Sequence, residues 1–293
     1  MDNNIITAEH ITAYADHLRA EERSPGTIAK YTRDLTVFAL WLDGRGVTKE
    51  NAARGKAHLL ERGYKPTSIN AMLSAINGFF AFMGWPIKVK FLKIQHQLFR
   101  DPARELSRQE YDRLLTAARE SGQERLALIM ETLCATGIRV SELRYITVEA
   151  ALAGRATITL KGKIRTILLP SKLCRKLLKY AKKQKTASGE IFLTKSGRPI
   201  TRRQVWFELK RLCKAAGVES TKVFPHNLRH LFATTFYRAC RDIVRLADML
   251  GHSSIDTTRI YLMVSGAEQQ RQLDRLGLIP LFAARSGSLG ANR

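Results

Sequence analysis

Six side chains in the second half of the chain are of types that could together transfer a phosphoryl group. They are two arginines, a lysine, two histidines and a tyrosine: Arg139, Lys161, His226, Arg229, His252 and Tyr261. Arginine and lysine bind phosphate oxygens, histidine exchanges protons near neutral pH, and a tyrosine hydroxyl can act as a nucleophile. The set contains no cluster of acids that would hold Mg²⁺, so it predicts phosphoryl transfer without a metal ion.

Most of these residues also have an ordinary structural explanation when each is taken alone. Arg139 follows an apolar stretch and fits a surface arginine in a turn between helices. Lys161 lies in a basic turn, and such turns are common. A lone histidine after a helix end, as at His252, is more often structural. A lone tyrosine at the spacing of Tyr261 more often belongs to a half-buried core.

His226 and Arg229 are the pair that most favours a functional site. Residues three apart share one face of a helix, so these two side chains are expected to point the same way. A proton carrier beside a permanent cation suits a phosphate group. The structural alternative is a polar helix start that His226 merely caps.

The overall charge predicts a polyanionic partner. The chain has 49 Lys and Arg against 26 Asp and Glu, a formal net charge of +23. Solubility alone needs roughly 2–8 net charges in a small domain. Nucleic acid is therefore the expected partner, and a membrane surface is less favoured because neither terminus shows a basic amphipathic helix. We expect a cytoplasmic protein, since no apolar run approaches roughly 18 residues and the polar start is unlike a signal peptide.

Cysteine spacing and glycine motifs indicate a protein without cofactors. The four cysteines are widely spaced, with no Cys-x-x-Cys pair: Cys134, Cys174, Cys213 and Cys240. Reduced thiols are expected, not a zinc site or disulfides. The sequence has no Gly-x-x-x-x-Gly-Lys-Ser/Thr loop for nucleotide phosphates. We therefore expect no metal ion, no cofactor and no need for ATP.

The hydrophobic pattern predicts two units in a mostly α fold with a small β-sheet, the α+β class. Residues 1–95 predict a helical domain whose first helix is capped by Thr7. Residues 96–104 predict a linker, and residues 105–282 a domain of helices and strands. Residues 283–293 are rich in Gly and Ser and are predicted to be disordered.

The second unit carries several local signals. Residues 156–161 and 165–169, with Gly162 between them, predict a β-hairpin. A short strand is expected at 190–193 and one continuous helix at 256–270. Two capping boxes predict helix starts, at Ser107–Glu110 and Thr201–Gln204.

Five motifs occur in order along the second unit. They are Ala135–Leu143, the Lys161 hairpin, His226-x-x-Arg229, Leu250-Gly251-His252 and Thr257-Thr258-x-x-Tyr261. The first unit carries Thr27-x-x-x-Tyr31-x-x-Asp34-Leu35-x-x-Phe38-x-x-Trp41-Leu42. The five motifs resemble the tyrosine recombinase (phage integrase) family, and the first unit resembles that family's SAM-like core-binding domain. The resemblance covers about residues 5–275.

The resemblance implies an architecture and a reaction. The architecture is a C-shaped clamp around duplex DNA, with the helical core-binding domain on one face and a mixed α/β catalytic domain on the other. In the reaction Tyr261 attacks the scissile phosphate, forms a 3′-phosphotyrosyl link and releases a 5′-hydroxyl. Four copies of the chain, a tetramer on DNA, would exchange strands at two specific sites through a Holliday junction.

The resemblance also implies roles for the other five residues. Arg139 and Arg229 would bind the non-bridging phosphate oxygens, and His226 would be the general base. Lys161 would protonate the leaving 5′-oxygen, and His252 would donate a hydrogen bond to the phosphate.

The hairpin departs from the family pattern in one respect. The family usually has Lys-Gly-x-Lys-x-Arg, whereas Lys161-Gly162-Lys163-Ile164-Arg165 is one residue shorter. Either Lys161 or Lys163 fits the role of the acid, and Lys161 is preferred because it ends the first strand.

Two other functions fit the same residues. A type IB topoisomerase uses very similar residues to relax supercoils as a monomer. A DNA-binding factor that has lost catalysis is the second alternative. The compact helical N-terminal domain favours the recombinase, as does the apolar segment after Tyr261. The resemblance implies that part of this segment docks on a neighbouring protomer, whereas its ordinary structural explanation is packing within its own chain. All six candidate residues are present, which argues against a silent factor.

Overall fold

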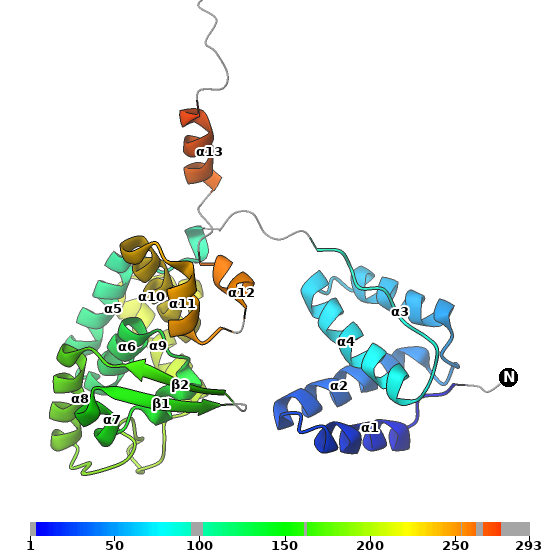
Figure 1. Ribbon diagram of the computed structural model, residues 1–293, viewed down its shortest axis with the longest axis horizontal. Helices are drawn as coiled ribbons and strands as arrows, with labels where there is room; N and C mark the ends of the chain where they lie inside the picture. The colour runs from blue at the N-terminus through cyan, green and yellow to red at the C-terminus, as the bar shows by residue number, and fades with distance from the viewer. Residues whose placement is uncertain (1–3, 95–101, 161–162, 253, 262–265, 277–293) are drawn as a thin grey trace, which may run out of the picture. The chain divides into compact units, whose positions relative to one another are not determined.

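The computed structural model describes residues 4–94, 102–160, 163–252, 254–261 and 266–276. The chain divides into two compact units, Met1–His96 and Gln97–Arg293 (Figure 1). Helices make up most of both units, and the described residues form one two-stranded sheet. The mostly helical fold with a small sheet, predicted from the sequence, is confirmed. Within the described ranges no helix has the length and apolar character needed to cross a membrane.

The first unit consists of four helices around an apolar core. They are α1 (Ala8–Ala20), α2 (Pro25–Leu42), α3 (Lys49–Glu61) and α4 (Pro66–Phe82). Thr7, Ser24 and Thr48 cap the first three, because each side-chain oxygen accepts from a backbone N–H of the first turn. The predicted Thr7 cap is confirmed. Leu35, Ile69, Phe79 and Phe80 are fully buried where α2 and α4 pack together.

The second unit packs helices against one face of its hairpin. Its elements are η1 (Pro102–Arg104), α5 (Arg108–Glu120), α6 (Glu124–Thr136), η2 (Val140–Tyr145), α7 (Val148–Ala153), β1 (Arg155–Leu160), β2 (Lys163–Leu168), α8 (Ser171–Lys183), α9 (Arg202–Ala216), η3 (Ser220–Lys222), α10 (Pro225–Cys240), α11 (Ile243–Leu250), α12 (Ile255–Arg259) and α13 (Gly266–Arg275). Both predicted capping boxes are confirmed, at the starts of α5 and α9.

The predicted β-hairpin is confirmed. Strands β1 and β2 pair antiparallel, with Ile158 opposite Arg165 and Leu160 opposite Lys163. Ile158 and its strand neighbour Ala156 are buried in the core, and α7 packs against β1 and α8 (Figure 1). Lys161 and Gly162, which separate the strands, lie outside the described residues.

Two predicted elements are wrong. Residues 190–193 form no regular strand but make two isolated bridges, Thr147 with Glu190 and Leu193 with Pro199. The expected helix at 256–270 is not continuous, because α12 ends at Arg259 and α13 begins at Gly266. The backbone N–H of Tyr261 donates to the Thr258 carbonyl at 2.9 Å, so the chain tightens there and does not continue the α-helical pattern.

The join between α6 and η2 depends on a glycine. Gly137 ends α6 with φ +66°, in the left-handed region that favours glycine. A Cβ added there would lie 2.3 Å from the ring of Phe232 on α10. Close packing of α10 against the end of α6 therefore sets the path of the chain toward Arg139.

This packing predicts that Gly137→Ala destabilises the protein more than a matched control. Gly154 has nearly the same φ, +67°, but nothing lies within 4 Å of an added Cβ. Gly154→Ala should cost only the left-handed strain, about 1–2 kcal/mol. Gly137→Ala should lose about 1–3 kcal/mol more because it overpacks against Phe232. Urea unfolding measures both, and equal losses would contradict the proposed packing.

Candidate active site

Five of the six candidate residues line one pocket of about 590 Å³. They are Arg139, His226, Arg229, His252 and Tyr261. These residues come from four regions of the second unit: the start of η2, the start of α10, the turn after α11 and the end of α12. The pocket wall also includes Arg202 and Trp206 of α9. The sixth candidate, Lys161, lies outside the described residues.

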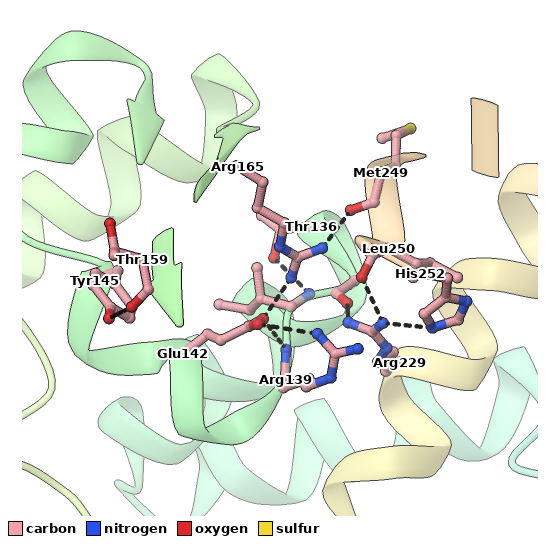
Figure 2. A network of polar contacts seen from close by, with 12 residues as sticks. Thr136, Arg139, Glu142, Tyr145, Thr159, Arg165, Arg229, Met249, Leu250 and His252 are labelled. Carbon is pink, nitrogen blue, oxygen red and sulfur yellow. Dashed lines mark hydrogen bonds and ion pairs between the residues drawn. The ribbon is translucent and has the colours of Figure 1, made fainter. Parts of the chain in front are cut away.

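Arg229 is a buried cation at the centre of the site. Its side chain donates to the Gly137 carbonyl at 2.5 Å and to the Leu250 carbonyl at 2.8 Å, and it is 2% exposed. The same guanidinium lies 3.0 Å from His252 Nε2 (Figure 2), and it lies beside the Tyr261 side chain, which lines the same pocket. Burial and then the charge of Arg139 lower its pKa, but an arginine remains protonated at neutral pH. One cation thus joins the ends of α6 and α11 to the tyrosine.

Arg139 and a second arginine share one buried carboxylate. Glu142, 1% exposed, accepts from the Arg139 backbone N–H at 2.7 Å and from Arg139 Nη1 at 3.2 Å. Arg165 Nη2 donates to the same carboxylate at 2.6 Å (Figure 2). Part of the Arg139 side chain stays open, at 42% exposure, so it remains available to a ligand in the pocket.

His252 is held as a neutral imidazole. Burial, followed by the charges of Arg229, Arg139 and Arg165, lowers its pKa to about 4. Its Nδ1 lies 2.9 Å from the hydroxyl of Thr258, which is fully buried. Because the Arg229 guanidinium can only donate, Nε2 accepts and the ring proton is assigned to Nδ1, which donates to Thr258.

His226 lies at an exposed position of the pocket wall. Partial burial of its ring lowers the pKa, and the charges of Arg229, Arg139 and Arg202 lower it further. At neutral pH the ring is therefore uncharged and able to accept a proton. The suggestion that His226 merely caps a helix is wrong, because Phe224 is the N-cap of α10 and no side chain caps it.

Tyr261 is packed inside the pocket wall. It is 4% exposed and contacts a small cluster that includes Phe232 and Leu250. Its ring centroid is 4.9 Å from that of His230 and 5.9 Å from that of His252, with the latter pair stacked at 11°. The tyrosine is thus buried, as the structural alternative expected, and also borders the pocket beside a guanidinium.

The site carries surplus positive charge. Arg139 and Arg165 both pair with the carboxylate of Glu142, and the guanidinium of Arg229 is a third cation, so these four groups carry 3 − 1 = +2 while the histidines are neutral. A phosphate group is the kind of anion that such a fixed set of donors binds.

Sequence reasoning missed three residues of this site. Glu142 lies within the first motif, three residues after Arg139, and a capping-box pattern was the signal that could have found it. Arg165 and Thr258 were quoted in motifs but given no role. Arg165 contacts Met249, 84 positions further along the chain, and no local sequence pattern predicts such a contact. Thr258 contacts His252, which is only 6 positions away.

Comparison with known proteins assigns the chain to a family. A model of the phage integrase family matches residues 104–268, more than half of the chain. A model of the phage integrase N-terminal SAM-like domain matches residues 11–85. The chain therefore belongs to the phage integrase family, the tyrosine recombinases, and the resemblance seen in its motifs is confirmed.

Named relatives and solved structures agree with this assignment. Tyrosine recombinase XerA of Thermococcus kodakarensis is 31% identical over 92% of this chain and 96% of its own length. Tyrosine recombinase XerD of Pseudomonas aeruginosa is 30% identical, over 90% and 96%. A lambda integrase tetramer bound to a Holliday junction aligns with TM-score 0.71 at 19% identity, covering 89% of this chain and 78% of that one. XerH bound to palindromic difH aligns with TM-score 0.70 at 17% identity, covering 95% and 91%. The two structures support the fold.

The lowered pKa of His252 predicts a pH dependence of stability. As the pH falls below about 6.5, the unfolded chain takes up a proton before the folded one, whose His252 pKa is about 4. Stability that His252 contributes above pH 6.5 should therefore be lost progressively as the pH falls toward 4. The lowered pKa of His226 acts in the same direction.

Unfolding of the wild type and of His252→Gln at several pH values between about 7.5 and 4.5 tests this. The stability advantage of the wild type should shrink as the pH falls. An advantage that stays constant across this range would show that His252 is not held neutral.

Proposed function

We propose that the chain is a site-specific recombinase that cleaves and rejoins duplex DNA through a covalent link between Tyr261 and a 3′-phosphate. The observation that carries the proposal is the placement of buried Tyr261 beside Arg229, in a pocket with surplus positive charge. A phosphate bound by Arg229 would lie beside the tyrosine hydroxyl. Residues 105–282 would form the catalytic domain, and residues 1–95 the core-binding domain.

The arginines would bind the scissile phosphate. Arg229 is already fixed by two backbone carbonyls, so its guanidinium needs little reorganisation when a phosphate arrives. Arg139 is anchored on Glu142 yet partly exposed, which allows it to donate to a second non-bridging oxygen. Both would stabilise the negative charge that builds in the transition state.

Proton transfer would involve His226. A phenol has a pKa of roughly 10, so Tyr261 needs a base to take its proton as it attacks. His226 is neutral and lines the same pocket, and it would return the proton when the strand is rejoined.

His252 would change partners when the phosphate binds. In the described state its Nε2 lies 3.0 Å from Arg229. With Arg229 engaged by phosphate, a proton on Nε2 would let His252 donate to a phosphate oxygen. The Thr258 hydroxyl, 2.9 Å from Nδ1, supports either tautomer because a hydroxyl both donates and accepts.

Lys161 would protonate the departing 5′-oxygen. The phosphotyrosyl link would keep the energy of the broken phosphodiester bond, so rejoining would need no ATP, and the arginines would take the place of a metal ion in stabilising charge. Four copies of the chain on two DNA sites would then exchange strands through a Holliday junction, in the cytoplasm where the DNA is accessible. One solved structure similar to this fold is a lambda integrase tetramer on such a junction.

Tyr261→Phe tests the nucleophile, since it keeps the ring and removes the hydroxyl. DNA binding should persist, while covalent adducts on a substrate nicked beside the scissile phosphate should vanish. Tyr237→Phe is the matched control, because Tyr237 packs against the same small cluster. Adducts that persist in Tyr261→Phe and vanish in Tyr237→Phe would move the nucleophile to α10.

The roles of Lys161 and Lys163 can be distinguished with a DNA substrate in which sulfur replaces the bridging 5′-oxygen. A thiolate leaves without being protonated, so this substrate needs no general acid. A general acid contributes about 10²–10⁴-fold, so Lys161→Ala should slow cleavage by about that factor. The sulfur substrate should restore its rate, whereas Lys163→Ala should mainly weaken binding. Rescue of Lys163→Ala instead would assign the acid to Lys163, and rescue of neither would make His226 the candidate.

A further inference from the structure

Arg165 makes two buried contacts that belong to different parts of the site. Its Nη2 donates to Glu142 at 2.6 Å and its Nη1 donates to the Met249 carbonyl at 3.0 Å (Figure 2). The side chain is 16% exposed. It thus links β2, η2 and the last turn of α11 through one planar group.

The surrounding backbone is shaped around this guanidinium. Gly251 has φ +65°, and a Cβ added there would lie 2.5 Å from Arg165 Nη1. His252 is the next residue, so the guanidinium packs against the turn that presents this histidine. The hairpin is tied to η2 a second time, because the Tyr145 hydroxyl donates to the Thr159 carbonyl of β1.

Each partner of Arg165 leads to a phosphate-binding side chain. Glu142 accepts from both Arg139 and Arg165, so the position of its carboxylate sets the position of the Arg139 guanidinium. Met249 precedes Leu250, whose carbonyl accepts from Arg229. A change at Arg165 would therefore reach Arg139, Arg229 and His252 without touching the pocket directly.

We propose that Arg165 is a positioning residue for strand cleavage, which fixes Arg139 and the turn carrying His252 relative to each other. This inference rests on the proposed function and adds a residue to it. Both contacts require a planar fork with separate donors, which arginine has and lysine lacks.

The chain offers a matched control for a merely structural role. Arg125 also joins a glutamate and a backbone carbonyl, because its Nη2 contacts Glu208 at 2.5 Å and its Nη1 donates to Leu193 at 2.7 Å. Its side chain is 24% exposed, and it borders a different pocket from the candidate active site. Arg125→Met therefore removes a comparable bridge away from the proposed chemistry.

The experiment compares wild type, Arg165→Met, Arg165→Lys and Arg125→Met on nicked DNA at saturating concentration. The rate of covalent adduct formation is divided by the folded fraction of each protein. Arg165→Met should cleave about 10²-fold more slowly, which is the cost of a small misplacement of catalytic groups. Its affinity for DNA should change little. Arg165→Lys should keep most of the defect, and Arg125→Met should cleave like the wild type.

The bridging 5′-sulfur substrate separates two routes of action. Because Arg165 is proposed to act on the phosphate-binding groups, sulfur should not rescue Arg165→Met. Rescue by sulfur would overturn the proposal, because it would show that Arg165 supports the hairpin lysine that protonates the leaving 5′-oxygen. Equal rate losses in Arg165→Met and Arg125→Met, or a full rate in Arg165→Lys, would also overturn it. Absence of adducts with the wild type would instead refute the proposed function itself.

Discussion

The second unit depends on a buried guanidinium, that of Arg229. Burying a charge costs several kcal/mol unless partners compensate it. Its partners are two carbonyls at the C-terminal ends of α6 and α11. The last carbonyls of a helix have no N–H donor within that helix, and they form the negative end of its dipole. The two helix ends therefore stabilise the guanidinium, and the guanidinium donates the hydrogen bonds that their free carbonyls would otherwise lack. Neutral partners leave its full positive charge in place, which is why we propose that a phosphate group binds there.

The same arrangement explains the state of the histidines. Burial, followed by the charges of the neighbouring arginines, lowers the pKa of His252 to about 4, so the ring stays neutral. A neutral imidazole costs less beside Arg229 than an imidazolium would. Tyr261 is held by packing against His230 and His252, so it needs no ligand to place its ring. The protein's own contacts thus hold the described candidate residues in place.

The sequence predicted what local chemistry determines. Ser107 and Thr201 begin helices because their side chains cap the first turn, and the spacing of His226 and Arg229 placed both on one wall of the pocket. The sequence did not predict the bridge from Arg165 to Met249, because 84 residues separate the partners. It also missed the end of α12 at Arg259, where a tight turn onto Tyr261 overrides helical periodicity.

We propose that Tyr261, held beside Arg229, is the residue that joins DNA. The most direct measurement is to trap the covalent complex on nicked DNA, digest both components, and locate the attached nucleotide by mass spectrometry. We expect one modified peptide, with the nucleotide joined through its 3′-phosphate to the oxygen of Tyr261. Attachment to any other residue, or through a 5′-phosphate, would contradict it.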